Sequence, residues 1–325
     1  MKIRVIHIYF EGGAVSQLLA LGTGIYFKNL QNMNFTLNYR NLILVHTKGF
    51  KLAKFLLPDE TYKTFTPLKK EIKMNRFWSK IPSRFIPYFK WIRLLYQHAR
   101  SLFFSFNASF QKKDPTVLRN KISNDRRLLN NLNPNISTIH GPFWPGLVGS
   151  VWPELDSRFK LAKITSPFER IEYLQERIVV HYRLGDMRTV PYWANSHGVI
   201  TPKFFVEIVD LVNRKFLLKL PVHVYSDEPE IARRLLKSIG IFDWKIHSNS
   251  LIWNDISEMK NCVAFIGSFS TVSSLVCEIR KIQKLKNNYL PINSRRFKIG
   301  RLEKLDKVKY LRAHYLPESH WIYQI

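Results

Sequence analysis

The chain has 325 residues, 46% of them hydrophobic, so it can form two packed domains, since single cores rarely grow beyond about 250 residues. Its 51 Lys and Arg residues far outnumber its 24 Asp and Glu residues, and the formal charge of +27 excludes the charge balance of an ordinary neutral enzyme. This charge predicts an anionic partner: nucleic acid, an anionic membrane surface or a phosphorylated substrate.

The cysteines and the apolar runs bear on whether the protein has a metal site, a signal peptide or a membrane segment. Cys262 and Cys277 form no CxxC pair and no Cys/His run at zinc spacing, so no structural metal site is expected. Two cysteines in apolar surroundings suit a reducing cytoplasm. The N-terminal apolar run superficially resembles a signal peptide, but it is short and contains His7, so a first strand is the better prediction. The sequence contains no uninterrupted run of roughly 18 apolar residues, so no transmembrane helix is predicted.

The N-terminal region predicts a strand, a turn and a helix. Residues 3–9 have strand character, residues 11–13 read Glu-Gly-Gly, and apolar residues recur at helical spacing over 14–30. Residues 41–46, NLILVH, are the next predicted strand, which gives the βαβ beginning of a parallel α/β domain. The full GxGxxG pattern is missing, so a plain tight turn is the simpler interpretation of the glycine pair.

The segment 48–127 has a different composition, with 19 Lys or Arg residues against five Asp or Glu. Within it, residues 76–110 interleave aromatic and basic side chains. This mixture favours an interfacial helix on an anionic bilayer. A core-facing helix with a solvated basic side and a surface for single-stranded nucleic acid are the alternatives.

A stretch rich in proline, residues 133–167, is predicted to be mostly loop and to separate two domains. The boundary is expected within residues 165–177, which gives domains 1–170 and 171–325. The second half alternates strands and helices, which predicts a parallel sheet with ligand sites at the carboxyl ends of its strands. Its predicted elements are a strand from Ile178, a helix from a Thr201 cap and Pro202 to Phe216, a strand over 221–225, a helix over 231–239 stopped by Gly240, a helix over 252–261, a strand over 263–266 and a helix after Thr271.

Three of these strand ends carry polar groups that one sheet would gather at one edge. They are His181, Arg183 and Asp186; Ser226 and Asp227; and Ser268, Ser270 and Thr271. The third precedes a helix, so its backbone N–H groups and hydroxyls form a natural phosphate cradle. The fork of Arg183 suits a phosphate, and Gly185 permits a close backbone approach or a positive φ. Asp186 could hold Arg183 or cap a turn. No D-x-D sequence occurs, which argues against a divalent ion on a sugar nucleotide, and serine hydrolase, P-loop and zinc hydrolase signatures are absent.

The strand-end motif HYRLGD, residues 181–186, resembles the HxRxGD motif of the α-1,2-fucosyltransferases, within the GDP-fucose-dependent fucosyltransferases. Three further stretches are similar to that family in the same order. They are EGGAVSQLLALGTGIYF at 11–27, VYSDE at 224–228 and NDISEMKNCVAFIGSFSTVSSL at 254–275. Together the four stretches span most of the chain at compatible spacings.

The resemblance implies a fold of the GT-B type, with two Rossmann-like domains facing a cleft. Domain 171–325 would bind the donor GDP-fucose, and domain 1–170 would bind the acceptor glycan. The implied reaction is inverting transfer to a hydroxyl without a metal or other cofactor.

The resemblance also implies roles for individual residues. Arg183 would contact the diphosphate and assist its departure, and Asp255 would meet the guanine edge. Glu11 is the candidate general base, although a solvated turn residue is an equal interpretation. His181 and Asp186 would shape the donor loop. The remaining donor-binding candidates are Ser226, Asp227, Ser268, Phe269, Ser270 and Thr271, and the acceptor-binding candidates are Gly12, Gly13 and Gln17.

The chain departs from the family pattern at three places: Thr271 to Ser274 replace paired tryptophans, Leu184 replaces a second Arg, and Ser16 replaces an Asn. Another GDP-sugar therefore stays open as donor. We expect a bacterial enzyme of surface polysaccharide or lipopolysaccharide synthesis, cytoplasmic and peripheral to the inner face of the membrane through residues 76–110. Its acceptor would be a glycan or a lipid-linked glycan, and no nucleic acid partner is expected. A basic nucleic-acid-binding protein and a non-catalytic sugar-nucleotide-binding relative are the alternatives.

Overall fold

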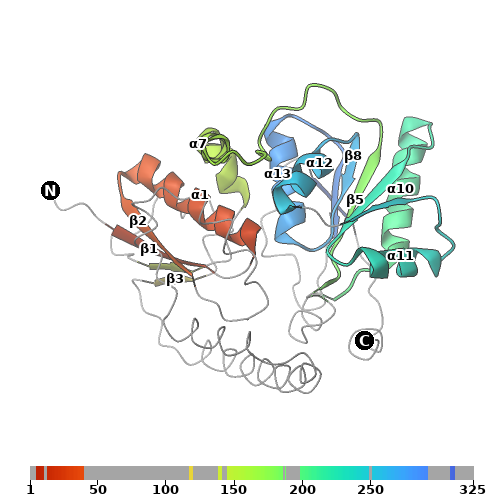
Figure 1. Ribbon diagram of the computed structural model, residues 1–325, viewed down its shortest axis with the longest axis horizontal. Coiled ribbons are helices and arrows are strands. Elements are labelled where there is room, and N and C mark those ends of the chain that lie inside the picture. The colour runs from red at the N-terminus through yellow and green to blue at the C-terminus, as the bar shows by residue number, and fades with distance from the viewer. Residues whose placement is uncertain are drawn as a thin grey trace, which may run out of the picture. The chain divides into compact units, whose positions relative to one another are not determined.

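The chain forms two compact units, residues 1–158 and 159–325, each built on a parallel sheet (Figure 1). This computed structural model describes residues 5–10, 13–39, 117–119, 138–140, 145–185, 187, 198–248, 251–291 and 308–311. The two units divide after Arg158, inside a helix, and the predicted domain boundary at residue 170 stays a prediction. The predicted α/β class with Rossmann-like units is confirmed, and a cleft shared by the units stays a prediction.

The described strands of the first unit form a parallel sheet in the order β2-β1-β4-β3. They are β1 (Val5–Phe10), β2 (Asn34–Tyr39), β3 (Val117–Arg119) and β4 (Thr138–His140). Helix α1 (Ala14–Gln31) joins β1 to β2, so the predicted βαβ beginning is confirmed. Its second strand lies earlier than the expected 41–46, which are outside the described residues. As an edge strand, β2 alternates polar and apolar residues and lacks the continuous apolar run that we sought.

The stretch predicted to be loop contains helix α7 (Val148–Leu161), which follows a 3-10 turn, η4 (Pro145–Leu147). The loop prediction was therefore wrong for these residues. Pro153 lies inside the helix and removes one backbone donor. The buried residues Val148, Val151, Leu155 and Phe159 recur at helical spacing. The burial of these residues offsets the missing hydrogen bond. Their helical spacing was the sequence signal for α7, and the prolines around it concealed that signal.

The described strands of the second unit form a six-stranded parallel sheet in the order β10-β9-β8-β5-β6-β7. Its strands are β5 (Ile178–Tyr182), β6 (Val222–Ser226), β7 (Lys245–His247), β8 (Ala264–Ile266), β9 (Asn288–Pro291) and β10 (Val308–Leu311). Counted from the first strand of the unit, this is the Rossmann order 3-2-1-4-5-6. The order reverses between β5 and β8, so these two neighbours define the switch point where such sheets bind ligands.

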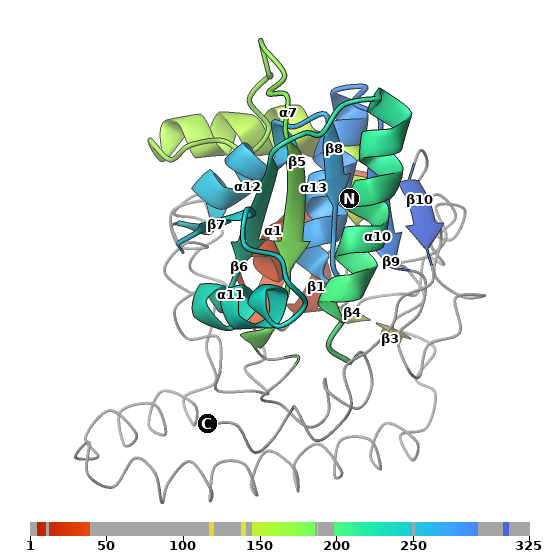
Figure 2. The ribbon, with the colours of Figure 1, turned by 90° about the vertical axis from the view of Figure 1, so that its right-hand side faces the viewer.

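The described helices of this unit cover both faces of the sheet (Figure 2). On one face lie α10 (Pro202–Phe216) and α11 (Pro229–Lys237), and on the other lie α12 (Ile252–Lys260) and α13 (Thr271–Ile282). All four were predicted, with ends shifted by three residues or fewer. Thr201 occupies the N-cap position of α10 with Pro202 first in the helix, but its side chain makes no capping hydrogen bond. Gly240, just after α11, has a left-handed backbone with φ +82°.

Burial explains why β5 is the centre of the unit. All five of its residues are buried, and Ile178, Val180 and Tyr182 belong to the core that packs on α10. The ring of Tyr182 lies 4.7 Å from that of Phe205, and its hydroxyl donates to the carbonyl of Ile200 at 2.8 Å. In the described part of the chain, no helix is long and apolar enough to cross a membrane.

Candidate functional site

Three adjacent strands, β8, β5 and β6, bring their carboxyl ends to one edge of the second sheet. The register places Tyr182 opposite Ser226 and Val180 opposite Ile266. The residues that follow these strands are therefore neighbours, as the sequence suggested. We call this group, residues 181–185, 226–228 and 267–271, the donor edge, after the role that the sequence resemblance predicts for it. It includes the β5–β8 switch point.

The central contact of the donor edge joins Arg183 to Asp227. Nη1 of Arg183 lies 3.0 Å from Oδ2 of Asp227, and about a quarter of each side chain is exposed, 21% and 26%. The same carboxylate accepts hydrogen bonds from the N–H of Leu184 at 2.8 Å and of Gly185 at 3.1 Å. Asp227 thus holds both the guanidinium and the backbone of the loop after β5. About a fifth of the Arg183 side chain reaches solvent at this edge, and a guanidinium is a group that suits phosphate.

Gly185 is required by the approach of that carboxylate. A Cβ atom at this position would lie 2.5 Å from Oδ2 of Asp227, well inside contact distance. Its φ is not positive, so the close approach, and not a left-handed backbone, explains the glycine. Of the two reasons that the sequence offered for Gly185, the structure supports the first.

Behind Arg183, three buried side chains connect β5 to β8 and α13. The hydroxyl of Ser268 donates to the carbonyl of His181 at 2.5 Å and accepts from the N–H of Arg183 at 2.9 Å. The hydroxyl of Ser273 accepts from the N–H of Ser268 at 3.0 Å and lies 2.7 Å from Nδ1 of His181. This network fixes the backbone of Arg183, because the Ser268 hydroxyl bonds both to the Arg183 N–H and to the His181 carbonyl.

Burial keeps His181 neutral at physiological pH. Desolvation, with a smaller contribution from the nearby charge of Arg183, lowers the pKa of His181 to about 3. A neutral imidazole beside Ser273 suits a positioning role better than proton transfer. Ser273 was not among the predicted site residues. No local sequence pattern shows that a serine inside α13 contacts a histidine in the distant strand β5.

The start of α13 lies at the same edge. Ser270 is its N-cap, with extended backbone, and its hydroxyl accepts from the N–H of Val272 at 3.2 Å. Thr271 is exposed and Phe269 is half-buried. The first N–H groups of a helix have no partner within it and carry partial positive charge, so this end attracts an anion.

The guanine candidate Asp255 stands in the first turn of α12, near two stacked rings. The ring of Tyr225 lies 4.3 Å from that of His247 at an interplanar angle of 7°. Burial raises the pKa of Tyr225 to about 12, and the carboxylates of Glu258 and Asp255 add to this shift. His181 on β5 pairs in register with Tyr225 on β6, and Tyr225 pairs with His247 on β7. The three rings therefore form one row across the sheet, which starts at the switch point and ends near Asp255. Sequence reasoning missed this row because it did not find β7.

Arg177 contacts His223, which lies beside His247 of this row. Its guanidinium lies 3.0 Å from Nδ1 of His223 and pairs with Glu258 at 3.0 Å. Nε2 of His247 also approaches Nδ1 of His223, at 3.1 Å. Burial, followed by the charge of Arg177, lowers the pKa of His223 to about 4.

Ser226, a predicted donor-binding residue, contacts its own turn. Its hydroxyl accepts a hydrogen bond from the N–H of Glu228 at 3.1 Å in the turn before α11.

The predicted acceptor residues belong to the first unit. Gly13 is the N-cap of α1, and Gln17 in its first turn is only 3% exposed. The amide nitrogen and oxygen of Gln17 make no hydrogen bond within the described residues. Glu11, Gly12 and, in the second unit, Asp186 lie outside the described residues, so their roles stay predictions.

A metal site was not expected, and that expectation also stays a prediction. The described ranges contain no cluster of three or more His, Cys, Asp or Glu side chains that could hold a metal ion. The Arg183 guanidinium and the α13 N-terminus are the described groups at the donor edge that could neutralise a phosphate.

No family model and no curated protein sequence matches the chain. Its fold is similar to several solved structures. The E. coli heptosyltransferase WaaC with ADP-2-deoxy-2-fluoro heptose is 8% identical over 95% of this chain and 93% of that chain, with a TM-score of 0.41. The glycosyl transferase family 9 from Veillonella parvula DSM 2008 is 9% identical over 98% and 90%, with a TM-score of 0.41. The NodZ α-1,6-fucosyltransferase soaked with GDP-fucose is 10% identical over 86% and 93%, with a TM-score of 0.34.

Proposed function

We propose that the chain is a glycosyltransferase of the GT-B type that binds a nucleoside diphosphate sugar at the donor edge. The observation that carries this proposal is the position of Arg183. It follows β5 at the switch point of a Rossmann sheet, held by Asp227 and beside the N-terminus of α13. This is where open parallel sheets bind nucleotides, and the groups present there suit a diphosphate.

The proposed reaction is inverting transfer without a metal. The acceptor hydroxyl attacks the anomeric carbon, the bond from that carbon to the diphosphate oxygen breaks, and the electron pair leaves with the diphosphate. Arg183 and the α13 N-terminus stabilise the charge that develops on this leaving group. The hydroxyl proton passes to a general base, for which Glu11 is the proposed residue.

GDP-fucose is the proposed donor because the motif HYRLGD and the three accompanying stretches resemble the α-1,2-fucosyltransferases. Asp255, with the stacked rings of Tyr225 and His247 beside it, is the proposed neighbour of the guanine base. Another GDP-sugar is the runner-up. The proposed acceptor is a glycan or lipid-linked glycan of bacterial surface polysaccharide synthesis, met by Gly12, Gly13 and Gln17 at the cytoplasmic face of the membrane.

A thermal-shift panel of GDP, UDP, CMP and their sugars, with and without EDTA, tests the proposal. We expect a shift that is specific for GDP compounds and unaffected by EDTA, since a ligand at about 100 times its Kd adds about 2.7 kcal/mol of stability. Arg183→Ala should abolish the shift, whereas Arg170→Ala, which removes an exposed arginine of the same unit, should retain it. A shift with UDP compounds only, or one lost in EDTA, would contradict the assignment.

Two alternatives have distinct signatures. The charge of +27 also suits nucleic acid. Oligonucleotide binding whose log affinity falls steeply with log salt, without any response to nucleotide sugars, would favour a nucleic-acid-binding protein. GDP-sugar binding without turnover on any acceptor glycan would instead favour a non-catalytic relative.

A further inference from the structure

The ends of α10 and α11 carry apolar side chains that the fold leaves in water. Leu217 is 92% exposed and Leu218 55%, directly after α10, and Phe242 is 72% exposed after α11. Phe216 and Ile239 are partly exposed beside them. Single exposed apolar residues are ordinary, but a group of them marks an interaction surface.

The two groups belong to one surface. Lys219, after α10, pairs with Asp243, after α11, at 3.3 Å. Both helices also cover the same face of the sheet, as Figure 2 shows. We call residues 214–219 and 233–243 the basic apolar surface. It lies entirely within the second unit.

Leu217 combines an exposed apolar side chain with a left-handed backbone, which rarely carries a residue of this kind. Leu217 is the C-cap of α10 in the left-handed region, with φ 52° and ψ 31°. Glycine or asparagine is usual in this conformation, because a Cβ atom is crowded there. A leucine at this place neither favours the turn nor fills the core. A partner that takes up its side chain would explain it.

The charge of the basic apolar surface identifies that partner as an anion. Its two segments contain six basic residues and one acidic residue, Asp243, which pairs with Lys219; Arg233 pairs with Glu230, which lies earlier in α11. The basic residues are Arg214, Lys215, Lys219, Arg233, Arg234 and Lys237. Cations around protruding leucine and phenylalanine side chains match the headgroup region of an anionic bilayer, which offers phosphates above and acyl chains below.

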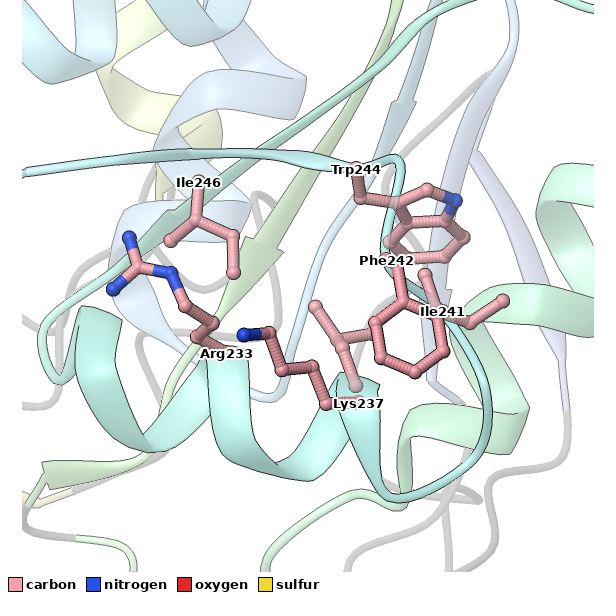
Figure 3. Close-up of a pocket in the computed structure, with 7 residues that line it drawn as sticks. Arg233, Lys237, Ile241, Phe242, Trp244 and Ile246 are labelled. Carbon is pink, nitrogen blue, oxygen red and sulfur yellow. The ribbon is translucent and has the colours of Figure 1, made fainter.

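An open pocket of about 230 Å³ adds to this match. It lies between α11 and the segment that follows, as Figure 3 shows. Arg233 and Lys237 project from the helix, and the rings of Phe242 and Trp244 come from the following segment. Cations beside an apolar hollow suit the junction between a lipid phosphate and its acyl chains.

We propose that the basic apolar surface lies on an anionic phospholipid bilayer, with Leu217, Leu218 and Phe242 inserted among the headgroups. This contact would attach the second unit to the membrane separately from residues 76–110. The proposal does not depend on the identity of the donor, and vesicle binding can be measured without any sugar transfer.

Co-sedimentation of the full chain with vesicles tests the contact. Wild-type protein should bind vesicles of phosphatidylglycerol and phosphatidylcholine, and it should bind pure phosphatidylcholine weakly. The double variant Leu217→Asn, Phe242→Ser should lower the partition coefficient about tenfold or more, since each change removes a large apolar side chain from the bilayer. Asparagine suits the left-handed C-cap, so the thermal melting curve should be retained. Leu161→Asn is the matched control, because Leu161 is 82% exposed at the end of α7.

A local probe separates this contact from general attraction between charges. Cys262 and Cys277 are buried, so Phe242→Cys can be labelled selectively with a polarity-sensitive dye. Its emission should shift to the blue on anionic vesicles, and that of labelled Leu161→Cys should not. Equal vesicle binding by wild type and double variant, or no dye shift, would overturn the proposal. Self-association that the double variant abolishes, without vesicle binding, would identify a second copy of the chain as the partner and overturn it too.

Discussion

Replacing Gly185 by alanine tests whether the Asp227 carboxylate organises the donor edge. The new methyl group would lie 2.5 Å from Oδ2 and 3.2 Å from Cγ of Asp227. An ordinary carbon–oxygen contact needs roughly 1 Å more, so the carboxylate must move. It then loses its geometry toward two backbone N–H groups, at 2.8 and 3.1 Å, and toward Arg183, at 3.0 Å.

The cost follows from those three contacts. Hydrogen bonds to a charged group contribute about 1.5–3 kcal/mol each, and partial exposure of the Asp227 carboxylate reduces that value. We therefore expect Gly185→Ala to lower the free energy of unfolding by about 2–3 kcal/mol. Affinity for GDP should fall as well, because Arg183 is no longer held at the edge.

Urea denaturation and GDP titration measure both effects, and a double-mutant cycle isolates their cause. In an Asp227→Ala background the obstructing oxygens are gone, so Gly185→Ala should cost less than about 0.5 kcal/mol there. Gly22→Ala in α1 is the matched control, since its methyl group meets nothing closer than 3.5 Å. It should be neutral or stabilise by up to about 1 kcal/mol. An equal cost of Gly185→Ala in both backgrounds would refute the reasoning.

Arg183→Ala should reduce kcat by about 10²–10³-fold with an unchanged circular dichroism spectrum, whereas comparable transfer by that variant would remove the diphosphate role. The buried His181 has a pKa of about 3, below its ordinary value of 6.5, so the unfolded chain binds the proton more readily between these values. The free energy of unfolding is therefore unaffected by His181 protonation above pH 6.5, and it falls by about 2 kcal/mol on acidification to pH 5. Urea titrations across this range should show less pH dependence in His181→Asn, and an unchanged slope would contradict the assignment. Gly24→Ala should destabilise by about 1–3 kcal/mol, because its methyl group would meet the ring of Phe35 at 2.4 Å, and thermal melting beside Gly22→Ala checks this.

Local signals explain which elements could be predicted. The Thr201 cap, the Gly240 stop and the apolar run of β5 each depend on neighbouring residues, and all three were found from the sequence. The strands β7, β9 and β10 have three or four residues each and were missed. Such short strands, two of them at the sheet edges, acquire their structure from the pairing partner. Helix α7 was missed because Pro153 interrupts an otherwise regular apolar spacing.

The sequence by itself determined that β5, β6 and β8 end in polar residues and that Arg183 is suited to a phosphate. It did so because strand periodicity, glycine turns and side-chain chemistry are local properties. Only the tertiary structure decided that Asp227 contacts Arg183, that Ser273 joins His181 to Ser268, and that the Asp227 carboxylate demands Gly185. Asp227 lies 42 residues from Gly185 along the chain, and Ser273 lies 92 residues from His181. They meet because the strand order, which depends on how the whole unit buries its apolar faces, makes β8, β5 and β6 neighbours.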